Sequence, residues 1–364
     1  MKNRNIIFVS IAIILAIFIG FAISQGRDTD TKTIKIGAIL PLTGTQAFAG
    51  EGMKNALEMA LHDLPNTKYK YELVIANNAF DVKSSISAAQ KLIDVDKVSA
   101  IIDAYAPIGN AVSPITEKAH IVHIGVAFDP KIAEGDYNFL LFTTPDTAAR
   151  AFLAEMQKRG LHTLGIFRVN NQGIFAVYSS LESLANQYGV TIVSDQMFQP
   201  GERDFKSLIA KSAPSKPDLY ALLALSPELE ILTRQLQDQG IHDISSTIYF
   251  ELAKDKSVFE GLWSVGYGEI SPDFVAKYKA KYKAKYNQDI TFGVPNVYDA
   301  FNILVQSAES YSGPGKPSSE FIAKQIQRVG DFQGVLGKLH VDSAGIIDTP
   351  TSIKIVKDGV LVGV

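Results

Sequence analysis

The 364-residue sequence contains no cysteine. This absence excludes disulfide bonds, thiolate metal sites, a cysteine nucleophile and a membrane anchor attached through a lipid-modified cysteine. An excess of positive charge is also lacking, because 35 Lys and Arg residues stand against 38 Asp and Glu residues, for a formal net charge of -3. Without a basic surplus there is no indication of a nucleic-acid-binding face, and no nucleic-acid partner is expected.

Motifs of catalysis and of metal or phosphate binding are missing as well. None of the six histidines belongs to a His-Glu-x-x-His motif. His120 and His123 flank the start of an apolar segment, where a structural role is favoured over metal binding. No Gly-x-Ser-x-Gly motif occurs, and residues 313–316 (GPGK) lack the spacing and the hydroxyl of a phosphate-binding loop. We therefore expect a protein without cofactor or metal that is not an enzyme.

The N-terminus carries the longest apolar run of the chain. Lys2 and Arg4 precede residues 6–23, an apolar stretch whose length lies between that of a signal-peptide core and that of a short spanning helix. The basic start favours export of everything that follows. Two interpretations remain open: residues 1–24 are a signal peptide that is removed, or an anchor that tethers the exported protein to the inner membrane. In both, the protein works in the periplasm or at the cell surface.

From residue 33 onward, short apolar runs alternate with amphipathic stretches, a pattern typical of βα units in a doubly wound α/β fold with parallel sheets. The predicted strands are residues 34–40, 71–76, 100–104, 122–126, 163–168, 191–197, 219–225 and 247–250. The predicted helices include residues 52–62, 84–95 and 227–239, and residues 273–330 read as mostly helical. Ligands of such sheets bind at the carboxyl ends of the strands, where we expect the site.

Several short motifs follow one another along the chain, each occurring once. They are IKIGAILPLTG at residues 34–44, FAG at 48–50, GERDF at 201–205, YDA at 298–300, FQGVLG at 332–337 and DSAG at 342–345. In their order and spacing they resemble the type I periplasmic solute-binding proteins of ABC transporters, in the leucine/isoleucine/valine-binding family. This resemblance implies two Rossmann-like lobes that are joined by three hinge crossings and close around a ligand.

The resemblance also implies lobe boundaries. Lobe 1 is expected to comprise residues 33–145 plus 272–333, and lobe 2 residues 146–268 plus 337–364. The first two crossings would fall in turn-forming segments at 143–146 and 266–272. The third would fall at 334–337, whose glycines tolerate backbone rotation, although a simple turn is the alternative.

Members of the family hold a ligand's carboxylate with hydroxyls and backbone amides of lobe 1 and cover the ligand with an aromatic side chain. Phe48 stands at the position of that cover, with packing into the core as the alternative. The loop with Tyr105, Ala106 and Pro107 matches the segment that usually offers paired serines. The loop with Ala127 and Phe128 matches one that usually offers a threonine. The hydroxyl groups of the carboxylate site are therefore missing here.

On lobe 2, the family holds the ligand's ammonium with an acidic group. Glu251 matches that group, although a solvated Glu at the end of a strand is the alternative. Gln172 falls where the family often has tyrosine, and either Leu225 or Ser226 falls at a second such position.

These substitutions predict a ligand other than a plain branched-chain amino acid. A less polar, aromatic or amide-like molecule is expected, because an unpaired carboxylate buried against Pro107 and Phe128 would cost several kcal/mol. The predicted function is capture of this molecule and its delivery to an ABC transporter permease. The alternatives are a tethered ligand sensor and a regulator of cell-wall synthesis, each acting through a partner protein. A regulator should lack a cleft of ligand size.

Overall fold

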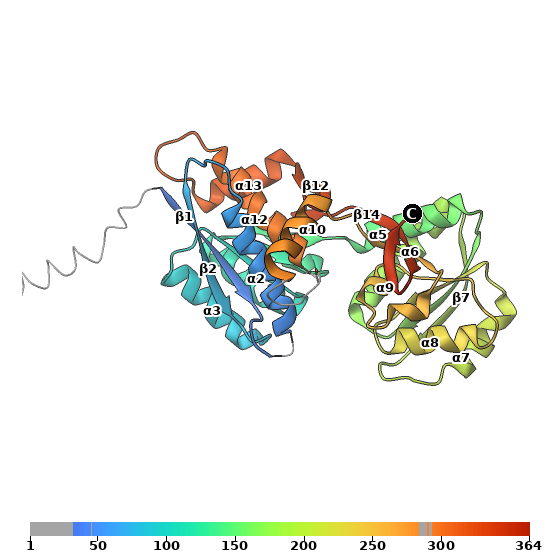
Figure 1. The fold of residues 1–364 in the computed structure, drawn as a ribbon. Coiled ribbons are helices and arrows are strands. Elements are labelled where there is room, and N and C mark those ends of the chain that lie inside the picture. The colour runs from blue at the N-terminus through green and yellow to red at the C-terminus, as the bar shows by residue number, and fades with distance from the viewer. Residues whose placement is uncertain (1–31, 45, 284–289, 291–292) are drawn as a thin grey trace, which may run out of the picture.

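The computed structural model describes residues 32–44, 46–283, 290 and 293–364. Two large hydrophobic cores form in this part of the chain, and they share no residue. The first draws on residues from β1 to β5 and again from 274 to 347. The second draws on residues 149–265 together with Val356. Figure 1 shows the two resulting bodies side by side, with the C-terminal strands returning to the second body.

The first body, lobe 1, is built on an eight-stranded sheet of order β11-β12-β13-β5-β4-β3-β1-β2. The strands from β13 to β2 are parallel, while β11 and β12 are antiparallel to their neighbours. Their bounds are Thr33–Leu40 (β1), Lys70–Asn77 (β2), Ala100–Ala104 (β3), Val122–Val126 (β4), Asn138–Phe142 (β5), Asp331–Gly334 (β11), Gly337–Val341 (β12) and Ile346–Asp348 (β13).

Helices cover both faces of this sheet, which explains why its strands read as nearly continuous apolar runs. In β1, Ile36 and Ala38 join the core formed with α2 and α12, whereas Ile39 joins the smaller core formed with α3 and α4. The helices are α2 (Ala47–His62), α3 (Val82–Asp94), α4 (Ala106–Ala119), α10 (Pro272–Tyr278), α12 (Val294–Glu309) and α13 (Ser319–Val329). Short turns are η1 (Pro130–Ala133) and η5 (Lys279–Lys283).

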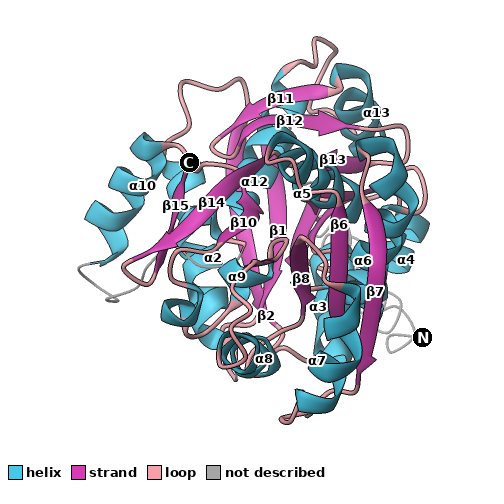
Figure 2. Cartoon of the chain, turned by 90° about the vertical axis from the view of Figure 1, so that its right-hand side faces the viewer, coloured by secondary structure: helices cyan, strands magenta, loops and turns pink. Residues whose placement is uncertain are grey.

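The second body, lobe 2, contains a parallel sheet of order β7-β6-β8-β9 and an antiparallel sheet of order β10-β14-β15; Figure 2 shows their strands in magenta. A parallel bridge between Ser246 and Ser264 joins the two sheets. The strands are β6 (Thr163–Val169), β7 (Thr191–Phe198), β8 (Leu219–Leu223), β9 (Ile244–Ser245), β10 (Trp263–Tyr267), β14 (Thr351–Lys357) and β15 (Val360–Gly363). The helices are α5 (Pro145–Lys158), α6 (Gln172–Leu184), α7 (Lys206–Ser212), α8 (Glu228–Gln237) and α9 (Tyr249–Leu252), with turns η2 (Ala185–Tyr188), η3 (Ala213–Ser215) and η4 (Lys256–Phe259).

The chain passes between the two lobes three times, between β5 and α5, between β10 and α10, and between β13 and β14. Hydrogen bonds tie the first crossing to the third. The hydroxyls of Thr143 and Thr349 lie 2.7 Å apart. The Asp348 carboxylate accepts the Thr144 backbone N–H at 3.0 Å and the Thr147 hydroxyl.

Two sequence-based expectations are wrong. The third crossing does not lie at residues 334–337, because β12 and β13 extend the lobe 1 sheet through parallel pairing of β13 with β5. Residues 247–250 do not form a strand, because Tyr249 begins the short helix α9. Short apolar runs do not distinguish a strand from one turn of buried helix. The predicted strands also do not include β5, β9, β10 or β11 to β15.

The apolar run at residues 6–23 lies outside the described residues. Within the described ranges, no helix combines the length and the apolar character needed to cross a membrane.

A buried carboxylate stabilises the turn between β11 and β12. Asp299 of α12 accepts the backbone N–H of Val335 at 2.7 Å with one oxygen and that of Leu336 at 3.1 Å with the other. Burial raises the pKa of Asp299 to about 7, even though both N–H donors favour the charged form.

The substitution Asp299→Asn tests this pKa. Since the folded protein binds this proton more tightly than the unfolded chain, where the pKa is 3.8, the stability it contributes is complete below about pH 4 and is lost as the pH rises through about 7. In urea unfolding, the difference in free energy of unfolding between wild type and variant should therefore decrease across this range. A difference that grows with pH would contradict the raised pKa. Asp238→Asn, at an exposed carboxylate, is the control.

Candidate ligand-binding site

Loops at the carboxyl ends of strands from both lobes surround a cavity of about 740 Å³, which we call the main cavity. This is where a doubly wound fold is expected to bind its ligand. Lobe 1 contributes Gln46, Phe48, Ala49, Phe80, Tyr105, Ala106, Pro107, Ala127 and Phe128. The first crossing and lobe 2 contribute Thr143, Thr144, Pro145, Ala148, Asn171, Gly173, Ile174, Val177, Leu225, Ile248, Tyr249, Leu252 and Lys254.

Aromatic side chains form much of the lobe 1 wall. Phe80 meets Tyr105 edge to face, with ring centroids 5.0 Å apart, and Phe128 meets Phe142 at 4.1 Å. Phe48 is 53% exposed at the start of α2, so it is not a core residue and its ring is available to a ligand. The alternative, packing of Phe48 into the core, is therefore not observed.

The backbone of Tyr105 is held in an unusual conformation. It has φ 77° and ψ 133°, a region that favours glycine. Its N–H donates to the Val126 carbonyl at 3.0 Å, and its hydroxyl contacts Gln46 Oε1 at 3.3 Å. Such backbone strain concentrates at functional sites, where the surrounding structure imposes it. Burial raises the pKa of Tyr105 to about 12, so the phenol stays protonated at neutral pH.

The polar groups of the main cavity are few. Among its described lining residues there is no Asp or Glu to pair with an ammonium group. The Thr143 hydroxyl is already bonded to Thr349, and the Asn171 side-chain oxygen accepts the Gly173 N–H at 2.9 Å. Lys254 supplies the one cationic side chain among these lining residues. The main cavity therefore suits an apolar or aromatic body better than a zwitterion.

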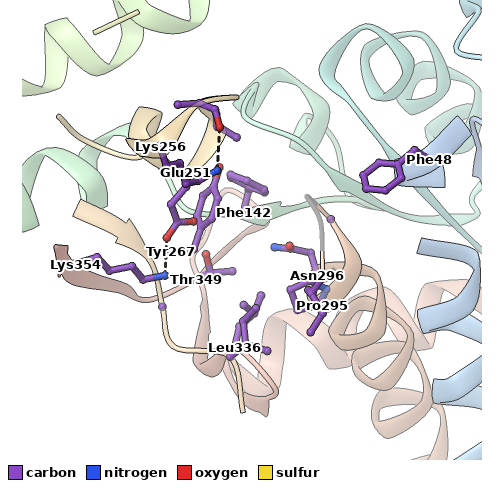
Figure 3. A pocket seen from close by; sticks show the side chains of 16 residues that line it. Phe48, Phe142, Glu251, Lys256, Tyr267, Pro295, Asn296, Leu336, Thr349 and Lys354 are labelled. Carbon is purple, nitrogen blue, oxygen red and sulfur yellow. Dashed lines mark hydrogen bonds and ion pairs between the residues drawn. The ribbon is translucent and has the colours of Figure 1, made fainter. Parts of the chain in front are cut away.

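A second cavity of about 450 Å³ adjoins the main cavity at Phe48 and Leu252, which line both. Its charged side chains lie on lobe 2 (Figure 3). Glu251 accepts a hydrogen bond from Lys354 at 2.5 Å, and both side chains are 14% exposed. Burial raises the pKa of Glu251, while Lys354 acts in the opposite direction. Burial also lowers the pKa of Lys256, whose ammonium donates to the Ala253 carbonyl at 2.9 Å.

The structure brings most of the predicted site residues together. Phe48, Tyr105, Ala106, Pro107, Ala127 and Phe128 all line the main cavity. Glu251 lines the second cavity and is ion-paired within lobe 2. Ser226 lines neither cavity, because its hydroxyl donates to Glu230 at 2.5 Å and accepts the Lys254 N–H. Its alternative, Leu225, does line the main cavity. Gln172 begins α6, and its side chain lies outside the described part of the structure.

Sequence reasoning missed several lining residues. Tyr249 was missed because residues 247–250 were predicted to form a strand, whereas Tyr249 begins α9 and lines the main cavity. Phe80 follows the end of β2, a position where a site residue is expected once the strand is recognised. Lys354 reaches the second cavity from β14, and no local sequence signal indicates this. No group of three or more possible metal ligands is present among the residues whose positions are described.

Comparison with protein families decides the identity of this two-lobed fold. The family model described as periplasmic binding protein matches residues 33–348. The chain belongs to this family. Membership implies export to the periplasm, and the binding proteins it matches are not enzymes; neither is this protein.

Individual relatives agree with this assignment. The chain is 24% identical over 332 residues to the Leu/Ile/Val-binding protein BraC3 of Rhizobium johnstonii, covering 86% of this chain and 88% of the relative. It is similar to the isoleucine complex of the branched-chain amino acid-binding protein LivJ of Streptococcus pneumoniae, with TM-score 0.71, 19% identity and coverage of 91% and 98%. It is also similar to a solute-binding protein of Rhodopseudomonas palustris in complex with 3,4-dihydroxybenzoic acid, with TM-score 0.70, 20% identity and coverage of 91% and 96%.

The Glu251–Lys354 ion pair generates a stability prediction. Lys354→Met leaves the Glu251 carboxylate buried without its partner, so we expect a loss of about 3–5 kcal/mol in the free energy of unfolding. The double substitution Glu251→Gln with Lys354→Met removes both charges and should recover most of that loss. Urea unfolding of the three variants tests this. Equal losses in the single and double variants would show that the packing of Lys354, not its charge, is responsible.

Proposed function

We propose that this periplasmic binding protein is the receptor of an ABC transporter that captures a small molecule in the main cavity and delivers it to a membrane permease. We further propose that the molecule is less polar than a branched-chain amino acid, with an aromatic or amide-like body. The observation that carries this proposal is the wall of the main cavity, which is aromatic and apolar and contains no carboxylate among its described residues.

Three positions on lobe 1 support this ligand class. Ala106, Pro107 and Phe128 stand where the family offers hydroxyls, and all three line the main cavity. Burial of the side chain of a leucine ligand stabilises the complex by about 2–3 kcal/mol. This gain is smaller than the cost of burying the ligand's carboxylate without hydrogen bonds. The complex of the Rhodopseudomonas palustris protein with 3,4-dihydroxybenzoic acid supports an aromatic ligand in this fold.

Export and the partner complete the proposal. Residues 1–24 would direct the chain across the membrane, as a signal peptide or as a retained anchor, and a permease would accept the ligand from the closed protein. The main cavity has the size of a ligand site, which favours a receptor over a regulator that acts without a ligand.

A ligand screen tests the proposed class. A thermal-shift screen of amino acids, amides, aromatic compounds and polyols should raise the melting temperature most with aromatic or amide-like compounds, because a ligand bound only to the folded state stabilises it. In calorimetric titration, leucine should fail to reach submicromolar affinity. Submicromolar leucine binding would show that backbone amides alone satisfy its carboxylate, and the proposed class would be wrong.

Phe48 provides a second test. Phe48→Ala should weaken binding of the best compound in the screen by roughly 10-fold or more, since loss of a ring that covers a ligand costs at least about 1.4 kcal/mol. The control is Phe175→Ala, because Phe175 is similarly exposed at 56% but lines neither cavity. Unchanged affinity in the Phe48 variant would remove this residue from the site.

A further inference from the structure

The second cavity contains more positive than negative charge. Its charged lining residues, among those the structure describes, are Glu251, Lys256 and Lys354. Glu251 and Lys354 neutralise one another at 2.5 Å. Lys256 forms no ion pair within 4 Å in the described part of the chain, and its ammonium donates to a neutral carbonyl. Among the described lining residues, the cavity therefore keeps one positive charge that is not part of an ion pair.

The Lys256 ammonium is partly buried. Burial is the main cause of the lowered pKa of Lys256. Glu251 and then Glu230 also act on Lys256 electrostatically, but Glu251 is paired with Lys354, and Glu230 accepts hydrogen bonds from the Ser226 hydroxyl and the Lys254 N–H. A desolvated cation is stabilised by an anion placed beside it.

Tyr267 is an uncharged residue that borders the same space. The hydroxyl oxygen of Tyr267 is buried and has no hydrogen-bond partner among the described residues, although Tyr267 lines the second cavity. Burial raises the pKa of this phenol, so it remains a hydrogen-bond donor. A buried hydroxyl without a partner costs free energy unless a ligand or water meets it.

Lobe 1 contributes a helix N-terminus from the other side. The 16-residue helix α12 begins after Gly293, which has no side chain to cap its first N–H groups, and its first turn contains no acidic residue. Pro295 and Asn296 line the second cavity opposite Glu251 and Lys354 (Figure 3), and Gly293 lines it as well. The positive end of α12 thus lies across the cavity from two lysines, an arrangement that an anion between the lobes would stabilise.

Resting on the function proposed above, we propose that the second cavity receives a carboxylate, held between Lys256, Lys354 and the start of α12, while the apolar body of the same ligand occupies the main cavity. The ligand is then an apolar or aromatic carboxylic acid without an amino group. An ammonium next to the carboxylate would enter a site where the charges of the described lining residues sum to a positive value and where their one carboxylate, Glu251, is already paired.

Matched compounds test this inference. The purified full-length protein is titrated by calorimetry with 4-methylpentanoate, its amide and leucine, and with phenylacetate and phenylacetamide. We expect at least one acid to bind roughly 10- to 100-fold more tightly than its amide, the effect of one hydrogen-bonded charge. The acid 4-methylpentanoate should bind more tightly than leucine, and its affinity should fall with ionic strength.

Variants assign the effect to the second cavity. Lys256→Met should abolish the preference for acid over amide, and Tyr267→Phe should reduce it. Lys357→Met, an exposed lysine of the same strand as Lys354 that lines neither cavity, should retain it. If Lys256→Met does not fold, Lys256→Gln replaces it, because the amide removes the charge and keeps an N–H donor for the Ala253 carbonyl.

The outcomes separate this inference from the proposed function. Amides that bind as tightly as the acids, or an acid preference that survives in Lys256→Met, would overturn the carboxylate site and leave an apolar ligand in the main cavity. Failure of every acid to bind the wild-type protein would also overturn the inference, whereas the proposed function depends on the wider screen. Acid selectivity lost in Lys256→Met and kept in Lys357→Met supports it.

Discussion

The hydrogen bonds between the first and third crossings are the constraint on which the arrangement of the molecule depends. Asp348 and Thr349 end lobe 1, and they bind the start of α5, where lobe 2 begins, through Thr143, Thr144 and Thr147. Two chain segments more than 200 residues apart are thereby joined into one short hinge. Because the crossings are adjacent, the carboxyl ends of the strands in both lobes face a common space, and the main cavity forms there.

The main cavity and the second cavity differ in the charge of their lining residues. The main cavity is lined mainly by aromatic and aliphatic side chains, with Lys254 as the one charged residue among its described lining, while the second cavity is lined by Glu251, Lys256 and Lys354. In the pattern that the sequence resembles, the acidic group of lobe 2 is reserved for a ligand's ammonium. Here the Glu251 carboxylate already forms an ion pair with Lys354 of β14. The ligand class that we propose from the missing hydroxyls on lobe 1 is therefore consistent with the pairing of Glu251 on the facing lobe.

Most of the fold could be predicted from sequence, because parallel strands covered on both faces leave a strong local pattern. Strands β1 to β4 and β6 to β8 lie within a few residues of their expected bounds. The prediction fails for strands whose position depends on pairing with residues far away in the sequence. Strand β13 joins β5 across about 200 residues, which no local pattern reveals. The same limit applies to the site: Tyr105 and Phe128 follow predicted strands directly, whereas Lys354 reaches its place only through the pairing of β14 with β10.

The left-handed backbone of Tyr105 limits how this binding site can change during evolution. At φ 77° and ψ 133°, glycine is accommodated easily, whereas other residues are strained and β-branched valine or isoleucine would be strongly disfavoured. The neighbouring Ala106 starts a regular helix and is free of this restriction. A lineage acquiring a new substrate would therefore be expected to alter position 106 or 128 first, and to keep position 105 within a narrow repertoire.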